Sequence, residues 1–193
     1  MVIGITGSIA SGKSLVTAYL KNKNYKVIDC DLITHEVLEK EEVKEKINSS
    51  FPNVITDNKI DRNKLGTIVF NNEEKKKLLE SIVMPFIVNE IEKQIKQNEL
   101  IFLDAPTLLE NNLQYLVDKL IVVKTSKEVQ LKRLMIRDNI SQEYALKKIN
   151  SQWPIEKKLK FADFVIDNDN TESDTYKQIE TILNCFKENK NEN

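Results

Sequence analysis

The stretch GSIASGKS at residues 7–14 has the residue types and spacing of a phosphate-binding loop. It matches the pattern G-x-x-x-x-G-K-S through Gly7, Gly12, Lys13 and Ser14, and it follows the apolar run VIGI with only Thr6 between them. Glycines let the backbone bend so that successive N–H groups face an anion, which the loop delivers to the N-terminus of a helix. The sequence therefore predicts a nucleotide site in which Lys13 reaches the β and γ phosphates and the Ser14 hydroxyl binds Mg²⁺.

A pair of aspartates in VIDCDLITH, Asp29 and Asp31, ends the next apolar run. Extended backbone alternates its side chains, so we expect both carboxylates on one side and Cys30 on the other. At the carboxyl edge of a parallel sheet, a carboxylate beside the loop could accept the proton of an attacking hydroxyl or hold Mg²⁺ through water. The alternative is that Asp31 caps a helix beginning at Leu32. We predict that Asp31 is catalytic.

Two arginines in EVQLKRLMIRD, Arg133 and Arg137, stand four residues apart and so share one helix face. Two guanidinium groups on one face could clamp transferring phosphates, whereas a solvated face is the plain alternative. Because the chain already carries a phosphate loop, we predict the clamp. Asp104 ends another apolar run and suits a contact with Mg²⁺ through water, or it could instead satisfy donors of the phosphate loop.

The segment NKID at 58–61 resembles the guanine-reading N-K-x-D of GTPases. In a GTPase this motif ends a buried strand late in the sheet, but here it follows PNVITD ahead of the third expected strand, and no D-x-x-G lies in the right place. We interpret it as a turn leading into a helix that Asp61 caps. His35 is the only histidine, so a His-rich metal site cannot be built.

Short β-branched runs alternate with longer amphipathic segments, which is the pattern of a parallel sheet flanked by helices. The expected strands cover residues 2–5, 25–28, 100–103, 120–123 and 164–166. Between the second and third, apolar residues from Leu78 to Ile95 recur at three- and four-residue steps, and Pro85 is expected to kink or split that helix. We predict a three-layer α/β fold with a parallel five-stranded sheet and an inserted helical lobe at about 61–98.

The composition limits the class of protein. The 193 residues, 40% hydrophobic and 31% charged, fit one soluble globular domain. With 29 basic and 30 acidic residues the net charge is −1, which argues against a nucleic-acid partner. No apolar stretch approaches the about 20 residues that span a bilayer, and the two cysteines form no C-x-x-C pair. We therefore expect a cytoplasmic protein with neither a nucleic-acid nor a membrane partner. We take a monomer as the expected state, although none of these features determines it.

These segments together resemble the dephospho-CoA kinases, which are P-loop enzymes of the nucleoside-monophosphate-kinase type. The resemblance runs from Ile3 to about Asn168, and it is carried by GSIASGKS, by D-x-D-x-x-x-H from Asp29 to His35, and by IDRNKLGTIVF, APTLLEN, QLKRLMIRD, INSQ and FADFVIDN. The P-loop alone marks only a superfamily. The D-x-D-x-x-x-H together with QLKR and AD-x-V-I-x-N is far more specific.

The resemblance implies transfer of a phosphoryl group from ATP, with Mg²⁺, to the ribose 3′-hydroxyl of dephospho-CoA, which gives coenzyme A. It implies that Asp31 is the base facing that hydroxyl, that Arg133 and Lys13 act on the phosphates, and that Arg137 is a lid arginine. Asn168 would lie where the family closes over the adenine. The residues implied to bind ATP are Ala10, Ser11, Gly12, Lys13, Ser14, Leu15, Arg137 and Asn168. Those implied to bind the acceptor are Asp29, Asp31 and His35. The lobe at 61–98 resembles the CoA-binding domain, and residues 126–152 resemble the lid.

Two alternatives stay open. The acceptor could be a nucleoside monophosphate or another small alcohol, or the chain could be a nucleotide-dependent switch with no acceptor. An acceptor screen with ATP distinguishes the first alternative from phosphorylation of dephospho-CoA. A comparison of ATP and GTP binding distinguishes the second alternative from a kinase.

Overall fold

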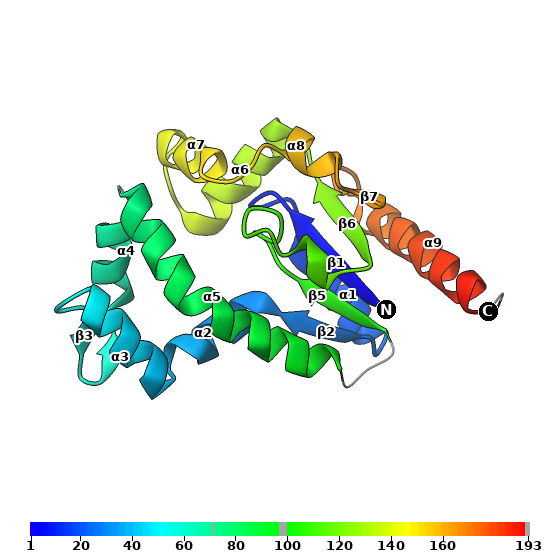
Figure 1. Cartoon of the computed structure of the whole chain (residues 1–193). Coiled ribbons are helices and arrows are strands. Elements are labelled where there is room, and N and C mark those ends of the chain that lie inside the picture. Colours follow the sequence, from blue (N-terminus) through cyan, green and yellow to red (C-terminus); the bar gives the residue numbers. More distant parts are fainter. Residues whose placement is uncertain (71, 97–99, 192–193) are drawn as a thin grey trace. The chain divides into compact units, whose positions relative to one another are not determined.

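The computed structural model describes residues 1–70, 72–96 and 100–191 (Figure 1). The chain divides into two compact units, one formed by Met1–Ile28 with Asn98–Asn193 and the other by Asp29–Gln97. Residues 97 and 98, which end the lobe predicted at 61–98, lie outside the described residues. None of the described helices is both long and apolar enough to cross a membrane.

The first unit is built on a parallel sheet. Its strands are β1 (Val2–Gly7), β2 (Lys26–Asp29), β5 (Ile101–Asp104), β6 (Lys119–Lys124) and β7 (Phe164–Asp167), in the order β2-β5-β1-β6-β7. Asp29, the last residue of β2, is the first residue of the second unit. Every residue of β1 and β5 is buried, as the continuous apolar runs of a parallel sheet predict. The predicted five-stranded parallel sheet is therefore confirmed, with strand ends shifted by one to two residues.

Alternate residues of a strand point to the same face of the sheet, and helices cover the apolar side chains on that face. Ile3 and Ile5 of β1 join one buried cluster with Val16 and Leu20 of α1 (Lys13–Asn22) and with Ile182 of α9 (Glu172–Asn191). The remaining elements of this unit are η1 (Gln114–Leu116), α6 (Lys127–Asp138), α7 (Gln142–Asn150) and α8 (Ile155–Leu159). The core thus fixes the carboxyl end of β1 and the start of α1, which flank the phosphate loop.

The second unit is mainly helical. It contains α2 (Cys30–Leu38), α3 (Glu41–Ser50), α4 (Arg62–Phe70) and α5 (Glu73–Ile95), and α5 packs against the other three. Pro85 lies inside α5, which continues as one helix, so the predicted split does not occur. One proline removes a single backbone donor, and packing of a long helix can offset that loss.

A short hairpin in the second unit was not predicted. Strands β3 (Ile55–Thr56) and β4 (Lys59–Ile60) are antiparallel, and the turn residues Asp57 and Asn58 have φ of 50° and 59°. Positive φ at both central residues is the geometry of a tight hairpin turn, which Asp and Asn tolerate. Of the segment NKID, only Asn58 lies in the predicted turn, because Lys59 and Ile60 form β4. Asp61 Oδ1 accepts the Lys64 N–H at 3.0 Å, so the predicted cap of α4 is confirmed.

Candidate active site

The loop between β1 and α1 has a backbone that only glycine fits at its two motif positions. Gly12 has a φ of 88°, and a Cβ atom there would lie 1.7 Å from the Asn168 amide nitrogen. A Cβ atom on Gly7 would lie 2.5 Å from the Val123 carbonyl oxygen. Ala10 takes a φ of 59°, a left-handed conformation that is unfavourable for a residue with a side chain. Close contacts with neighbouring strands and loops therefore hold this loop in one shape.

Lys13, the first residue of α1, forms an ion pair with Asp104 at the carboxyl end of β5. Both side chains are largely buried, at 17% and 11% exposure. The structure thus brings together two of the predicted site residues. Ser14 follows with its side chain exposed, and Leu15 is half-buried in the first turn of α1. Ser14 and Asp104 offer oxygen donors, which are the ligands that Mg²⁺ takes.

A cavity of about 350 Å³ opens beside the loop. It is lined by Ala10, Gly12, Ser14, Arg133, Ile136 and Arg137, so both predicted arginines of α6 face the same space. Within the described part of the chain, Arg133 Nη1 is buried and has no hydrogen-bond partner. A buried guanidinium nitrogen without a partner is costly, and an anion in the cavity would satisfy it.

Arg137 is held by its neighbour in the chain. Its Nε lies 2.8 Å from Asp138 Oδ1, and Lys148 Nζ of α7 lies 2.7 Å from Asp138 Oδ2. Hydrogen bonds lower the pKa of Asp138 from 3.8 to about 2, and the bond from Arg137 has a larger effect than the bond from Lys148. Asp138 therefore ties α7 to α6 next to the cavity.

Asn168 follows β7 and holds the loop through its side chain. Its Nδ2 donates to the Ser11 carbonyl at 2.9 Å, and its Oδ1 accepts the Thr175 hydroxyl at 2.8 Å. Asn168 is 4% exposed and is not among the residues that line the cavity. The structure thus places this side chain against the P-loop backbone, and its resemblance-based role at the adenine stays a prediction.

Lys158 of α8 is a functional candidate that the sequence analysis missed. Its ammonium is fully buried, donates to the carbonyls of Gly7 at 3.1 Å and Pro106 at 2.8 Å, and forms an ion pair with Glu110 at 2.8 Å. Burial lowers the pKa of Lys158, and the Glu110 carboxylate opposes that shift. Lysine is rarely buried, so nothing in its sequence context could have signalled this role.

In the second unit the two aspartates do not alternate along a strand, because α2 begins at Cys30. Asp29 is the N-cap of α2, and its Oδ1 accepts the N–H groups of Asp31 and Leu32 at 3.0 and 3.1 Å. The alternative that Asp31 caps a helix is therefore wrong, and so is the expected period-two placement. Asp31 lies in the first turn of α2, exposed and without a hydrogen bond or ion pair from its carboxylate to another described residue.

His35, one turn further along α2, contacts Arg62 of α4, to which the sequence analysis gave no role. Arg62 Nη1 of α4 lies 2.9 Å from His35 Nδ1 and 3.0 Å from Nε2. The Arg62 guanidinium also lies 3.9 Å from the Glu39 carboxylate. The second unit thus presents Asp31, His35 and Arg62 on helices that are packed together within it.

A phosphate loop between β1 and α1, at the carboxyl edge of a parallel sheet of this order, defines a P-loop kinase fold. The family model for dephospho-CoA kinase matches residues 1–174, and the chain belongs to this family.

Similar proteins agree with that placement. A dephospho-CoA kinase from Fusobacterium nucleatum is 44% identical over 184 residues, which cover 93% of this chain and 95% of that protein. Among solved structures, the dephospho-CoA kinase from Campylobacter jejuni is similar with a TM-score of 0.72 at 37% identity, with 95% of each chain covered. A crystal structure from Thermus thermophilus has a TM-score of 0.86 at 31% identity and covers 95% of this chain and 96% of that one.

Proposed function

We propose that the chain phosphorylates the ribose 3′-hydroxyl of dephospho-CoA with ATP, giving coenzyme A and ADP. The observation that carries this proposal is the match of the dephospho-CoA kinase family model to residues 1–174, on a chain whose P-loop borders a cavity with an unsatisfied Arg133 nitrogen. Lys13 and Arg133 would stabilise the charge on the transferring phosphoryl group. Preorganised charge of this kind provides most of the catalysis in phosphoryl transfer.

Asp31 is proposed as the base. The acceptor oxygen forms a bond to the γ-phosphorus, the bond from that phosphorus to the bridging oxygen of ADP breaks, and the hydroxyl proton passes to the Asp31 carboxylate. The carboxylate is exposed and makes no bond to another described residue, so it is available for this role. Asp29 is proposed to support it by capping α2, and His35 to contact the acceptor.

Mg²⁺ is the proposed cofactor. Among the described residues no group of three or more His, Cys, Asp or Glu side chains could hold a metal. A Mg²⁺ ion that keeps several waters and binds the nucleotide phosphates needs few protein ligands, and Ser14 and Asp104 would supply them. When bound, the ion would neutralise negative charge on the phosphates.

Four further assignments are proposals of the same kind. Residues 126–152, which contain α6 and α7, would form the lid, and residues 61–98, which contain α4 and α5, would bind the CoA portion of the acceptor. We propose that the enzyme is a monomer. We place it in the cytoplasm, where its two free cysteines would stay reduced.

An acceptor panel tests the proposed function. Purified protein is mixed with ATP, Mg²⁺ and either dephospho-CoA, AMP or shikimate, and ADP release is followed. We expect turnover on dephospho-CoA far above the other two. Turnover on AMP or shikimate without turnover on dephospho-CoA would overturn the proposal.

The role of Asp31 is tested by Asp31→Asn. Because Asp29 caps α2, the substitution should leave that helix intact while removing the proton acceptor. General-base help is typically worth 10²–10⁴-fold, and loose phosphoryl transfer needs the lower end, so we expect turnover to fall about 100-fold. The ATP dissociation constant should stay close to wild type. Unchanged turnover would show that the base lies elsewhere.

A further inference from the structure

Both peptide groups of one P-loop residue, Ile9, are bound by glutamine side chains from distant parts of the chain. The Ile9 N–H donates to Gln152 Oε1 at 2.8 Å, and the Ile9 carbonyl accepts from Gln130 Nε2 at 2.8 Å. Gln130 lies in α6, and Gln152 follows α7. Two side-chain amides thus hold a single peptide segment from opposite ends of residues 126–152.

The loop needs outside support at this point. Ile9 precedes Ala10, whose φ of 59° is unfavourable for a residue with a side chain, and the turn around it has one backbone bond, from Ser11 N–H to the Ser8 carbonyl at 3.1 Å. Gln130 is only 5% exposed, so its amide must be paired to avoid a desolvation cost. The glutamine contacts therefore support the backbone at Ile9, directly before the strained residue Ala10.

The same turn of α6 also faces the phosphate cavity. Gln130 and Arg133 are three residues apart, which places them on one helix face. Arg133 lines the cavity with Ala10 and Gly12, while Gln130 binds the loop one residue earlier, at Ile9. The same turn of α6 thus carries one side chain that binds the loop and another that lines the cavity beside it.

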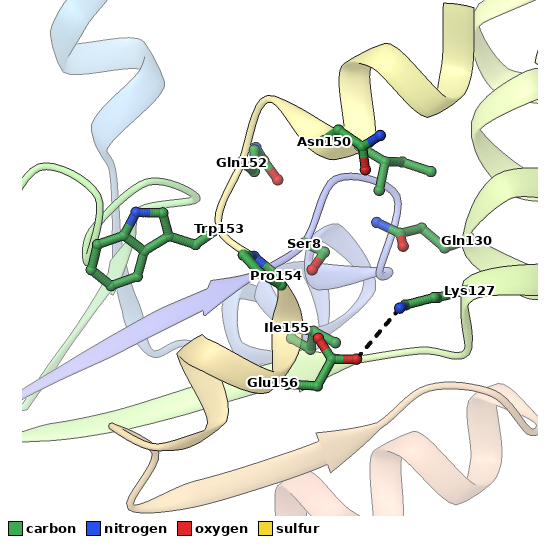
Figure 2. A pocket seen from close by; sticks show the side chains of 10 residues that line it. Ser8, Lys127, Gln130, Asn150, Gln152, Trp153, Pro154, Ile155 and Glu156 are labelled. Atoms are coloured by element: carbon green, nitrogen blue, oxygen red, sulfur yellow. Dashed lines mark ion pairs between the residues drawn. The ribbon is translucent and has the colours of Figure 1, made fainter. Parts of the chain in front are cut away.

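A second, smaller cavity of about 150 Å³ lies where these segments meet, and Ser8, Gln130 and Gln152 all line it (Figure 2). The ion pair drawn there, between Lys127 of α6 and Glu156 of α8 at 3.7 Å, joins two helices that border this cavity and does not reach the P-loop. Because both of its side chains are strongly exposed, that pair adds little stability. The two glutamine hydrogen bonds, from buried Gln130 and half-buried Gln152, are therefore the contacts that link the P-loop to these segments.

We infer that Gln130 and Gln152 are positioning residues that keep the P-loop in register with Arg133 and Arg137, so that loop and arginines meet the nucleotide phosphates together. This inference rests on the proposed function, since it takes the cavity beside the loop as the phosphate site. Neither glutamine touches the reacting atoms. Each acts through the backbone of Ile9.

The direction of each hydrogen bond gives a charge-matched test. In Gln152→Glu the carboxylate still accepts the Ile9 N–H, whereas in Gln130→Glu it faces the Ile9 carbonyl with no donor and is repelled. Gln142→Glu, at an exposed position of α7, controls for the added negative charge. Gln130→Leu and Gln152→Leu remove each bond without adding charge. For each variant, kcat, both KM values, the ATP dissociation constant and thermal unfolding are measured.

We expect Gln130→Glu to lower kcat/KM for ATP by about tenfold or more relative to Gln142→Glu, while the KM for dephospho-CoA changes little. Both leucine variants should show a similar loss, and Gln152→Glu should recover most of what Gln152→Leu loses. The inference would be overturned if Gln130→Glu and Gln152→Glu lost kcat/KM for ATP equally. It would also be overturned if the loss in each variant were fully explained by a smaller fraction of folded protein. If a Gln130 variant does not fold, the comparison of Gln152→Leu with Gln152→Glu still decides.

Failure of the proposed function gives a different result. If the wild-type chain does not phosphorylate dephospho-CoA, the acceptor assignment fails whatever the glutamines do. The same variants are then compared through their ATP dissociation constants, where Gln130→Glu should bind at least tenfold more weakly than Gln142→Glu. Equal ATP binding by these two variants would overturn the inference alone.

Discussion

The Lys13 ammonium and the Asp104 carboxylate form an ion pair that joins the start of α1 to the carboxyl end of β5. In the proposed reaction the ammonium contacts the β and γ phosphates, which carry more negative charge than one carboxylate. Asp104 is then left beside the phosphates as an oxygen donor for Mg²⁺. The pair thus holds Lys13 close to the loop before the nucleotide binds.

Lys13→Ala should therefore act mainly on the chemical step. By analogy with removing one donor that stabilises a transition state, we expect the activation free energy of the kcat step to rise by about 2.7–4 kcal/mol. ADP release with dephospho-CoA measures kcat. Lys21→Ala, at an exposed position in the last turn of the same helix, is the matched control and should retain wild-type turnover. Near-normal turnover of Lys13→Ala would refute the assignment of the P-loop.

Arg133→Lys should separate phosphate contact from structural support. The substitution keeps a positive charge but loses the planar fork, including the buried Nη1 that has no partner among the described residues. We expect kcat to fall by about tenfold or more, with a melting temperature close to wild type. A sharp drop in melting temperature with normal turnover per folded molecule would instead make Arg133 a structural residue.

Asp138 gives a prediction for acid stability. Its folded pKa of about 2 lies below the ordinary 3.8, so ionised Asp138 stabilises the fold, fully above about pH 4 and not at all well below pH 2. The free energy of unfolding of wild type minus that of Asp138→Asn should be constant above about pH 4 and shrink as pH falls towards 2. Denaturant unfolding between pH 2 and 7 measures it. A difference that does not change over this range would contradict the role of the Arg137 and Lys148 contacts.

The sequence predicted the features that depend on local pattern. The strands are short apolar runs, of which β1 and β5 are buried throughout, the glycine-lysine-serine spacing marks the loop, and an aspartate before a helix, Asp61, marks a cap. Each of these signals lies within a few neighbouring residues. They were enough to predict Lys13 in the phosphate loop and Arg133 and Arg137 on one helix face, and these two arginines line the cavity beside the loop.

Other features depend on tertiary contacts or on very short elements. The strands of the β3–β4 hairpin have two residues each, which is too short to show alternation. The alternation argument for Asp29 and Asp31 failed because a capping side chain starts α2 immediately after β2. Gln130, Gln152 and Lys158 belong to residue types that are mostly exposed, and their partners lie at least 48 residues away in sequence.

The central claim is that the γ-phosphoryl group of ATP moves to the 3′-hydroxyl of dephospho-CoA. The most direct measurement supplies ATP labelled in the γ-phosphate, with Mg²⁺ and dephospho-CoA, and locates the label in the products by phosphorus NMR. We predict that the label appears in a 3′-phosphomonoester of the acceptor ribose, in equal amount to the ADP formed. Label found only in inorganic phosphate, with dephospho-CoA unchanged, would contradict the claim.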